Sequence, residues 1–302
     1  MNTPSPYRCM LALLACACFS GPALAEDDQV QVLASLPITF SLGEALLQDT
    51  QVTLVRAAPA NLPASRQPSY FSTRGASVLE AAAREADATI SLRSLWPEDP
   101  LYPLARRSNI RIVEIDAARP VDGELPGIAL QTDATDLLAS QPWLNITNLG
   151  RMADVIAADL ARLAPADQPQ IQRNLATLKQ QLLQLNARSE SLLAALDNIS
   201  VARLNGHADY LLRGLNLDVV ETSIPEDGNW SDAALTELST QLRDYDVALV
   251  VLDREPDAAL SAAITAGGSK QVVLAESEGN PVSALEGAIG QVIEALADKN
   301  DQ

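Results

Sequence analysis

Histidine and cysteine, two of the residues that most often bind transition metals, are scarce in this chain. Its 302 residues include a single histidine, His207. All three cysteines, Cys9, Cys16 and Cys18, lie close to the N-terminus. Three imidazoles or a cluster of thiolates from one chain therefore cannot form a metal site here. A disulfide framework is excluded for everything after Cys18.

Basic residues and the motifs of common enzyme chemistry are also in short supply. The chain has 21 Lys and Arg against 39 Asp and Glu, a net charge of −18. This negative charge disfavours binding to DNA, RNA and anionic lipid, so we expect no nucleic-acid partner. The sequence contains no G-x-G-x-x-G or Walker loop, and no G-x-S-x-G motif around a nucleophilic serine. These absences favour a binding protein over an enzyme.

The N-terminus has the pattern of an export signal. Arg8 precedes an apolar stretch from Cys9 to Phe19, and Ala23-Leu-Ala25 offers the small residues that signal peptidase recognises. We expect residues 1–25 to be cleaved and the chain to be periplasmic. Leu13-Leu-Ala-Cys16 allows a lipoprotein signal as the alternative. No later apolar run reaches the roughly 18 residues that indicate a membrane-spanning helix.

Strand and helix patterns alternate in two separate parts of the chain. In the first part, short β-branched runs predict strands at 30–35, 52–55, 88–91 and 110–115, with helices at 41–47 and 76–86 and a long loop over 56–74. In the second part, strands are predicted at 199–204, 217–220, 247–252 and 271–275, with helices at 208–213, 231–243, 257–266 and 282–297. This alternation predicts two α/β, Rossmann-like lobes with mainly parallel sheets.

A long helical pattern lies between the two parts. Residues 168–196 contain no glycine, and Pro169 stands where a helix can begin. Leucine and isoleucine recur at four- and three-residue spacing with one gap at Ser189, which predicts one rigid helix about 43 Å long. A two-stranded coiled coil is the alternative. We prefer a helix packed on the lobes, giving an N-terminal lobe over 26–166, a linking helix over 167–197 and a C-terminal lobe over 198–302.

Several segments resemble the periplasmic solute-binding proteins of zinc and manganese ABC transporters. Trp143–Leu160 is similar to the family's Trp-Leu-Asp-Pro segment and the helix after it, with Asn148 and Met152 in register. Val32–Ile38 resembles the family's first strand and turn, and Tyr210-Leu211 its segment after the third metal ligand. The resemblance implies two lobes joined by one long helix. It also implies a metal ion between them, delivered without catalysis to an inner-membrane ABC permease.

The ligands that this resemblance implies are largely missing. The family's three histidine positions correspond to Pro68, Gln141 and Asn205, and His207 is displaced by two residues from the third. Carboxylate candidates follow two predicted strands. The candidate metal ligands are therefore His207, Glu255, Asp253, Glu276, Gln141 and Asn205. Fewer imidazoles would hold Zn²⁺ more weakly, and amide oxygens suit harder ions such as Mn²⁺.

Two features keep alternatives open. His207 is either a metal ligand or an ordinary polar residue at the start of a helix. Arginines on the predicted 56–74 loop suit an anionic ligand, such as a metal bound to a small chelator, or else are merely solvated. The residues expected near that ligand are Arg56, Arg66, Arg74, Tyr70, Phe71 and Trp96.

Together these observations predict a monomeric binding protein with no catalytic cofactor. Its transported ligand would be a zinc- or manganese-type divalent metal, or a metal chelate. The alternative is a metal-free accessory protein that docks on a transporter or on a partner binding protein.

Overall fold

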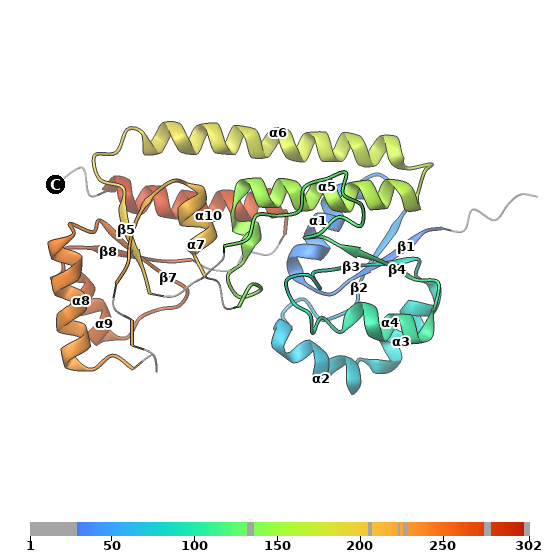
Figure 1. Ribbon diagram of the computed structural model, residues 1–302, viewed down its shortest axis with the longest axis horizontal. Coiled ribbons are helices and arrows are strands. Elements are labelled where there is room, and N and C mark those ends of the chain that lie inside the picture. Colours follow the sequence, from blue (N-terminus) through green and yellow to red (C-terminus); the bar gives the residue numbers. More distant parts are fainter. Residues whose placement is uncertain are drawn as a thin grey trace, which may run out of the picture.

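The computed structural model describes residues 29–131, 136–204, 207–222, 224–225, 229–274 and 279–298. It contains two four-stranded parallel sheets at the two ends of an elongated molecule (Figure 1). The helix α6 (Gln168–Leu193) runs along one side of both (Figure 1). The predicted α/β class with parallel sheets is therefore confirmed. Among the described residues, no helix is long and apolar enough to cross a membrane.

The first lobe is built on a sheet with the strand order β2-β1-β3-β4. Its strands are β1 (Gln31–Ala34), β2 (Thr53–Arg56), β3 (Ala88–Ser91) and β4 (Val113–Asp116). Its helices are α1 (Pro37–Leu46), α2 (Gln67–Ser72), α3 (Ala76–Glu85), α4 (Leu101–Ser108) and α5 (Ile146–Leu163), with short 3₁₀ turns η1 (Ala64–Arg66) and η2 (Pro142–Leu144). β3 is buried along its whole length, as expected for an inner strand of a parallel sheet.

The second lobe repeats this topology with the order β6-β5-β7-β8. Its strands are β5 (Ser200–Arg203), β6 (Asp218–Val220), β7 (Leu249–Leu252) and β8 (Lys270–Val273). Its helices are α7 (Asp209–Gly214), α8 (Asp232–Asp244), α9 (Ala258–Ala266) and α10 (Pro281–Ala297). In both sheets the first strand lies inside, between the second and the third, so both lobes are doubly wound.

The long helix packs against the rest of the chain, as expected, rather than presenting a bare coiled-coil stripe. It contacts α1, α5 and α10. The gap in its apolar pattern is filled by Ser189, which is buried and donates its hydroxyl hydrogen bond to the Leu185 carbonyl at 2.8 Å. α6 ends at Leu193, three residues before the predicted end at Leu196.

Two local predictions in the first lobe are wrong. α1 begins at Pro37 and not at Ser41, because proline at the first helical position starts the helix a turn earlier. Ser41 lies inside that helix and donates to the Ile38 carbonyl. The 56–74 segment is not one long loop: it contains η1 and α2, and Pro68 lies in the first turn of α2.

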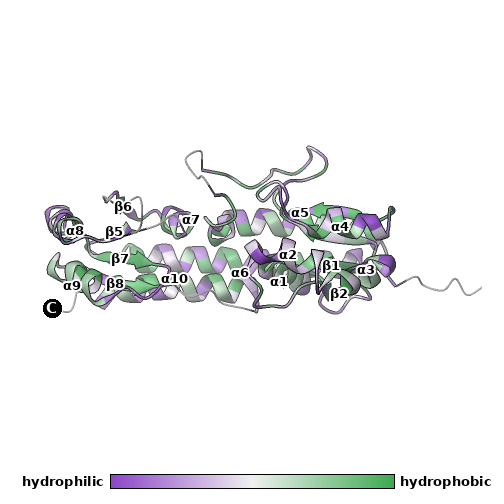
Figure 2. Ribbon diagram, turned by 90° about the horizontal axis from the view of Figure 1, so that it is seen from below, coloured by the Kyte–Doolittle hydropathy of each residue, from purple (hydrophilic) through white to green (hydrophobic). Residues whose placement is uncertain are grey.

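The main hydrophobic core is continuous across the two lobes. It joins one face of each sheet to α1, α5, α6 and α10, and it includes fully buried residues such as Val32, Ile156 and Val201. Smaller clusters lie under α2–α4 in the first lobe and under α8 and α9 in the second. The hydropathy colouring shows β7 as apolar and α6 as mixed (Figure 2). A shared core implies that the lobes are held rigidly together.

The lobes also meet where α7 approaches η2 and the start of α5. The Tyr210 hydroxyl accepts a hydrogen bond from the Gln131 backbone N–H at 2.8 Å. The side-chain oxygen of Asn145 caps α5 by accepting from the N–H groups of Thr147 and Asn148. Gly214, in α7, leaves room for that asparagine: a Cβ there would lie 2.6 Å from Asn145 Nδ2.

This contact predicts that replacing Gly214 by alanine destabilises the protein, although alanine usually stabilises a helix. Alanine in a helix is favoured by about 1 kcal/mol over glycine, so propensity alone predicts that Gly214→Ala stabilises the protein. We expect instead a loss of about 1–2 kcal/mol of unfolding free energy, because the new methyl group displaces the Asn145 cap. Urea unfolding measures the difference. Gly290→Ala in α10 is the control, since a Cβ there meets nothing within 4 Å and should stabilise the protein. A stabilised Gly214→Ala variant would contradict this account of the contact.

Candidate metal-binding site

The carboxyl ends of both sheets point toward the middle of the molecule (Figure 1). Open α/β sheets bind ligands at this edge of their strands. In the first lobe the edge follows Ala34, Arg56, Ser91 and Asp116. In the second lobe it follows Arg203, Val220, Leu252 and Val273. A ligand held between the lobes would therefore touch residues that directly follow these strands.

In the second lobe this edge carries a histidine–carboxylate pair. His207 lies in the turn between β5 and α7, and Asp253 directly follows β7. Because β5 and β7 are neighbours in the sheet, His207 Nδ1 comes within 3.7 Å of Asp253 Oδ2. Their side chains are 42% and 31% exposed, so both are in contact with solvent. Imidazole nitrogen and carboxylate oxygen are both ligands that Zn²⁺ and Mn²⁺ accept.

A second charged cluster next to this pair is already internally paired. Arg203, the last residue of β5, forms an ion pair with Asp209 and lies 3.4 Å from Glu221 Oε1. The side chains of Arg203 and Asp209 are only 14% and 12% exposed. The Asp209 carboxylate is thus committed to the guanidinium. This cluster was not predicted from the sequence, although an arginine at the end of a strand and acidic residues after it indicate such ion pairs.

Glu255 completes no group of three with His207 and Asp253 in the part of the chain that the structure describes. Glu255 is exposed on the segment that leads to α9. Gln141 precedes η2 in the first lobe, is partly buried, and has a left-handed backbone with φ of 49°. Asn205 and Glu276 lie outside the described residues. Across the described ranges, no group of three His, Cys, Asp or Glu side chains stands ready to hold a metal ion.

At the same edge of the first lobe, the structure singles out Arg56 among the predicted arginines. Arg56 closes β2, and its guanidinium carbon lies 3.9 Å from the centre of the Phe40 ring. Arg66 and Arg74 are exposed, with the Arg74 guanidinium 5.5 Å from the Tyr70 ring. Phe71 is 2% exposed and belongs to the cluster under α2–α4, so the expectation that it faces a ligand is wrong. Trp96 is partly buried against the main core.

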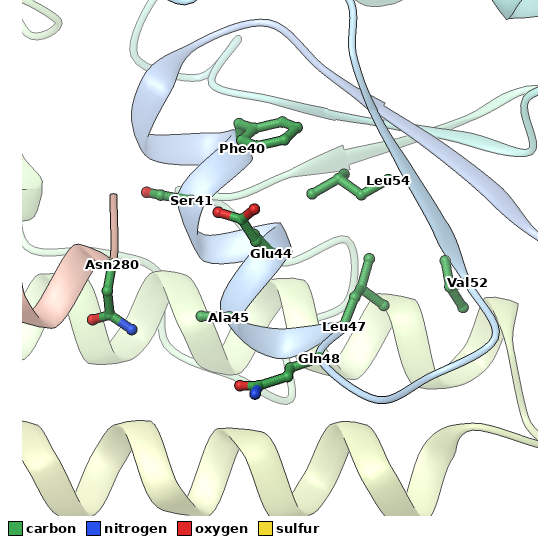
Figure 3. A pocket seen from close by; sticks show the side chains of 9 residues that line it. All are labelled: Phe40, Ser41, Glu44, Ala45, Leu47, Gln48, Val52, Leu54 and Asn280. Atoms are coloured by element: carbon green, nitrogen blue, oxygen red, sulfur yellow. The ribbon is translucent and has the colours of Figure 1, made fainter. Parts of the chain in front are cut away.

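A small open cavity of about 360 Å³ lies behind Phe40 (Figure 3). It is bounded by α1, by β2, and by Asn280 at the start of α10, so it also spans the two lobes. Ser41, Glu44, Gln48 and Asn280 provide its polar groups (Figure 3). Its lining offers one carboxylate and no imidazole, which does not make a site for a transition metal.

The turn after β3 contains a buried acid that the sequence analysis missed. Asp99 is 1% exposed and accepts hydrogen bonds from the N–H groups of Leu92 and Leu101 at 3.2 and 3.0 Å. Burial raises the pKa of Asp99 from 3.8 to about 6, against the opposing effect of these hydrogen bonds and of Arg93. Glu114 raises this pKa further. The acid therefore ties together the turn at the carboxyl end of β3.

The raised pKa predicts how stability depends on pH. The folded protein binds a proton at Asp99 between pH 3.8 and about 6 that the unfolded chain has released, so stability falls as pH rises through this range. The difference amounts to about 3 kcal/mol of unfolding free energy at most. Asp99→Asn should remove this component, whereas Glu98→Gln, at the exposed neighbouring position, should retain it. Urea unfolding of the three proteins from about pH 4 to pH 7 makes the comparison. Parallel profiles for wild type and Asp99→Asn would refute the assignment.

Comparison with known families identifies the chain. A family model described as zinc-uptake complex component A, periplasmic, matches residues 108–298. The chain belongs to this family. No protein of curated function matches it significantly by sequence.

Solved structures agree on the fold of this zinc-uptake family member. An FpvC mutant from Pseudomonas aeruginosa is 21% identical with a TM-score of 0.68, over 89% of this chain and 100% of that one. A crystal structure of ZnuA is 21% identical with a TM-score of 0.64, over 88% and 99%. A Mn-bound periplasmic metal binding protein mutant from Candidatus Liberibacter asiaticus is 13% identical with a TM-score of 0.66, over 88% and 99%. At these identities the likeness establishes the two-lobed fold.

Family membership confirms two expectations from the sequence. The resemblance to zinc- and manganese-type solute-binding proteins is correct, and the protein is a substrate-binding component for metal uptake rather than an enzyme. The family match covers the second lobe from β5 to α10, including the positions of His207 and Asp253.

Proposed function

We propose that this protein captures a divalent metal of the zinc or manganese type between its lobes in the periplasm and delivers it, as a monomer, to an inner-membrane ABC permease. The observation that carries the proposal is the His207–Asp253 pair at the carboxyl ends of β5 and β7. It supplies one nitrogen and one carboxylate ligand at the edge where two-lobed α/β proteins bind their cargo.

Two ligands alone make a weak site. Zn²⁺ takes about four ligands, and Mn²⁺ favours oxygen ligands more than Zn²⁺ does. The His207–Asp253 pair would therefore need further ligands. Gln141 from the first lobe, and Glu255, Asn205 and Glu276 from the second, are the remaining candidates in this proposal. A site with a single imidazole favours ready release to a permease over long retention of zinc.

The packing of α6 limits how the lobes can move. A helix that contacts α1, α5 and α10, over a core shared by both lobes, resists wide hinge bending. We therefore infer that capture and release depend on local rearrangement at the strand ends, and not on large closure of one lobe over the other.

Calorimetry with ZnCl₂ and MnCl₂ on the full chain tests the proposal. We expect one equivalent of metal to bind. His207→Ala should weaken that binding by about tenfold or more, because even the loss of a residue that only hydrogen-bonds a metal ligand lowers metal affinity by about this factor. Glu85→Gln is the control. It removes one exposed negative charge at the end of α3, next to the start of β3 and away from the carboxyl ends of the strands. Zinc binding that His207→Ala leaves unchanged would remove His207 from the site.

One observation favours the alternative function. The described residues contain no three-ligand metal group, which is what a metal-free accessory protein would show. Absence of zinc and manganese binding in the wild-type protein would favour that alternative and contradict the proposal above.

A further inference from the structure

We propose that the first lobe binds an oxyanion, so that the cargo is a metal held by an anionic hydroxycarboxylate chelator and not the bare ion. The site consists of Arg56, Ser35 and Gln67 at the carboxyl ends of β1 and β2. The inference rests on the proposed function and specifies the class of substrate.

Arg56 provides a partly buried positive charge for which the described residues supply no counter-ion. Its Nη1 atom is buried and has no hydrogen-bond partner among the described residues. Burying an unpaired charge is costly, and a guanidinium stays protonated at any physiological pH. The Phe40 ring 3.9 Å away fixes the guanidinium plane without neutralising it. A guanidinium has no lone pair for a metal, so this group suits the oxygen atoms of an anion.

Ser35 and Gln67 add two more buried groups at the same edge. Ala34 pairs with Arg56 across the sheet, which places Ser35 directly after that pair. Gln67 Nε2 donates to the Ser35 carbonyl at 3.2 Å and so brings its amide to this strand end. The two residues are 2% and 0% exposed, yet Ser35 Oγ and Gln67 Oε1 have no partner in the described part of the chain. Buried polar groups are normally paired, so atoms without a partner on three residues near the ends of two adjacent strands point to a ligand.

The chemistry of these three groups selects the ligand class. Arg56 donates to carboxylate oxygens in a bidentate manner, and the Ser35 hydroxyl donates or accepts. Gln67 Oε1 only accepts, so it calls for a donor such as an alcohol hydroxyl. A small hydroxycarboxylate presents both kinds of group.

The small number of metal ligands in the second lobe also favours a chelate as the cargo. His207 and Asp253 give a metal two ligands, and the described residues complete no group of three. A chelator supplies the missing oxygen ligands and at the same time carries the negative charge that Arg56 accepts. The metal end of such a chelate would face the second lobe, and its carboxylate end would face the first.

Zinc and citrate provide the test. Calorimetry on the full chain would compare ZnCl₂ alone, citrate alone and preformed zinc–citrate. We expect zinc–citrate to bind at least about tenfold more tightly than either component. Arg56→Gln should weaken zinc–citrate binding about tenfold or more, the worth of one charge-assisted hydrogen bond, and should leave binding of zinc alone unchanged. Arg107→Gln, which removes an exposed arginine near the end of α4, should change chelate binding less than about twofold.

Further variants keep the result decisive. Arg56→Lys retains the charge but loses the planar fork, and it should weaken chelate binding less than Arg56→Gln does. Arg56→Lys also replaces Arg56→Gln in this test if the circular dichroism spectrum shows that Arg56→Gln does not fold like the wild type. Equal chelate affinity in the Arg56→Gln and Arg107→Gln variants would overturn the anion site. Citrate that binds equally well with and without zinc would also overturn it. Zinc that binds alone as tightly as zinc–citrate would overturn the chelate but leave the proposed metal function intact. No binding of any form of zinc would overturn both.

Discussion

Replacement of Ile156 by alanine is expected to lower the unfolding free energy of the whole molecule by about 2–5 kcal/mol. Ile156 lies in α5, is fully buried, and belongs to the core shared by both sheets and by α1, α6 and α10. Deleting three carbon atoms there removes buried apolar surface and leaves a cavity, because α5 is held on one side by the long helix α6.

The shared core also predicts the form of the unfolding transition. Because residues of both lobes belong to one hydrophobic cluster, the two lobes should unfold together in urea, and Ile156→Ala should shift that single transition. Leu183→Ala is the matched control: it shortens an aliphatic side chain that is 69% exposed on α6, and should change stability by less than about 0.5 kcal/mol. Two separate transitions, with only the first lobe affected, would show that the lobes are energetically independent.

Zinc is expected to stabilise the protein strongly, and a chelator is expected to remove that stabilisation. A ligand that binds only the folded state at about 100 times its dissociation constant adds about 2.7 kcal/mol to the unfolding free energy. The sequence after the N-terminal cysteines has no thiolate and one histidine, so the unfolded chain competes poorly for the metal.

Thermal unfolding followed by circular dichroism measures this effect. Wild type should melt at a higher temperature with zinc and return to its metal-free midpoint when excess EDTA is added. His207→Ala should show little of the shift, while Glu85→Gln should show all of it. A zinc-induced shift of equal size in His207→Ala would mean that the stabilising ion binds elsewhere.

The sequence predicted the fold well because its signals are local and periodic. The leucine spacing of 168–196 and the alternation of short β-branched runs with helices require no knowledge of distant contacts. The errors occurred where one residue overrides the pattern. Pro37 starts α1 a turn before the expected cap at Ser41. Ser189 did not cause such an error, because its hydroxyl bonds to the Leu185 carbonyl and the predicted helix continues through it.

The site was less predictable because it depends on which strands lie side by side. His207 and Asp253 are far apart in sequence, and they meet only because β5 and β7 are neighbours. The resemblance to a family directed attention to Asn205 and Glu276, which lie outside the described residues. Arg56 was one of three equivalent arginines in the sequence, and only its stacking on Phe40 and its buried Nη1 distinguish it. Asp99 has no sequence motif, and the burial that is the largest cause of its raised pKa arises only when the chain folds.

The presence of one histidine allows the central claim to be tested at a single side chain. Full-length protein labelled with ¹⁵N-histidine gives one imidazole spin system in a nitrogen–proton NMR spectrum. If the protein binds its metal through the His207–Asp253 pair, stoichiometric Zn²⁺ will shift one ring nitrogen of His207 to the position of a metal-bound imidazole, and Asp253→Asn will weaken that response. An imidazole signal that stays unchanged while zinc binds would contradict the account.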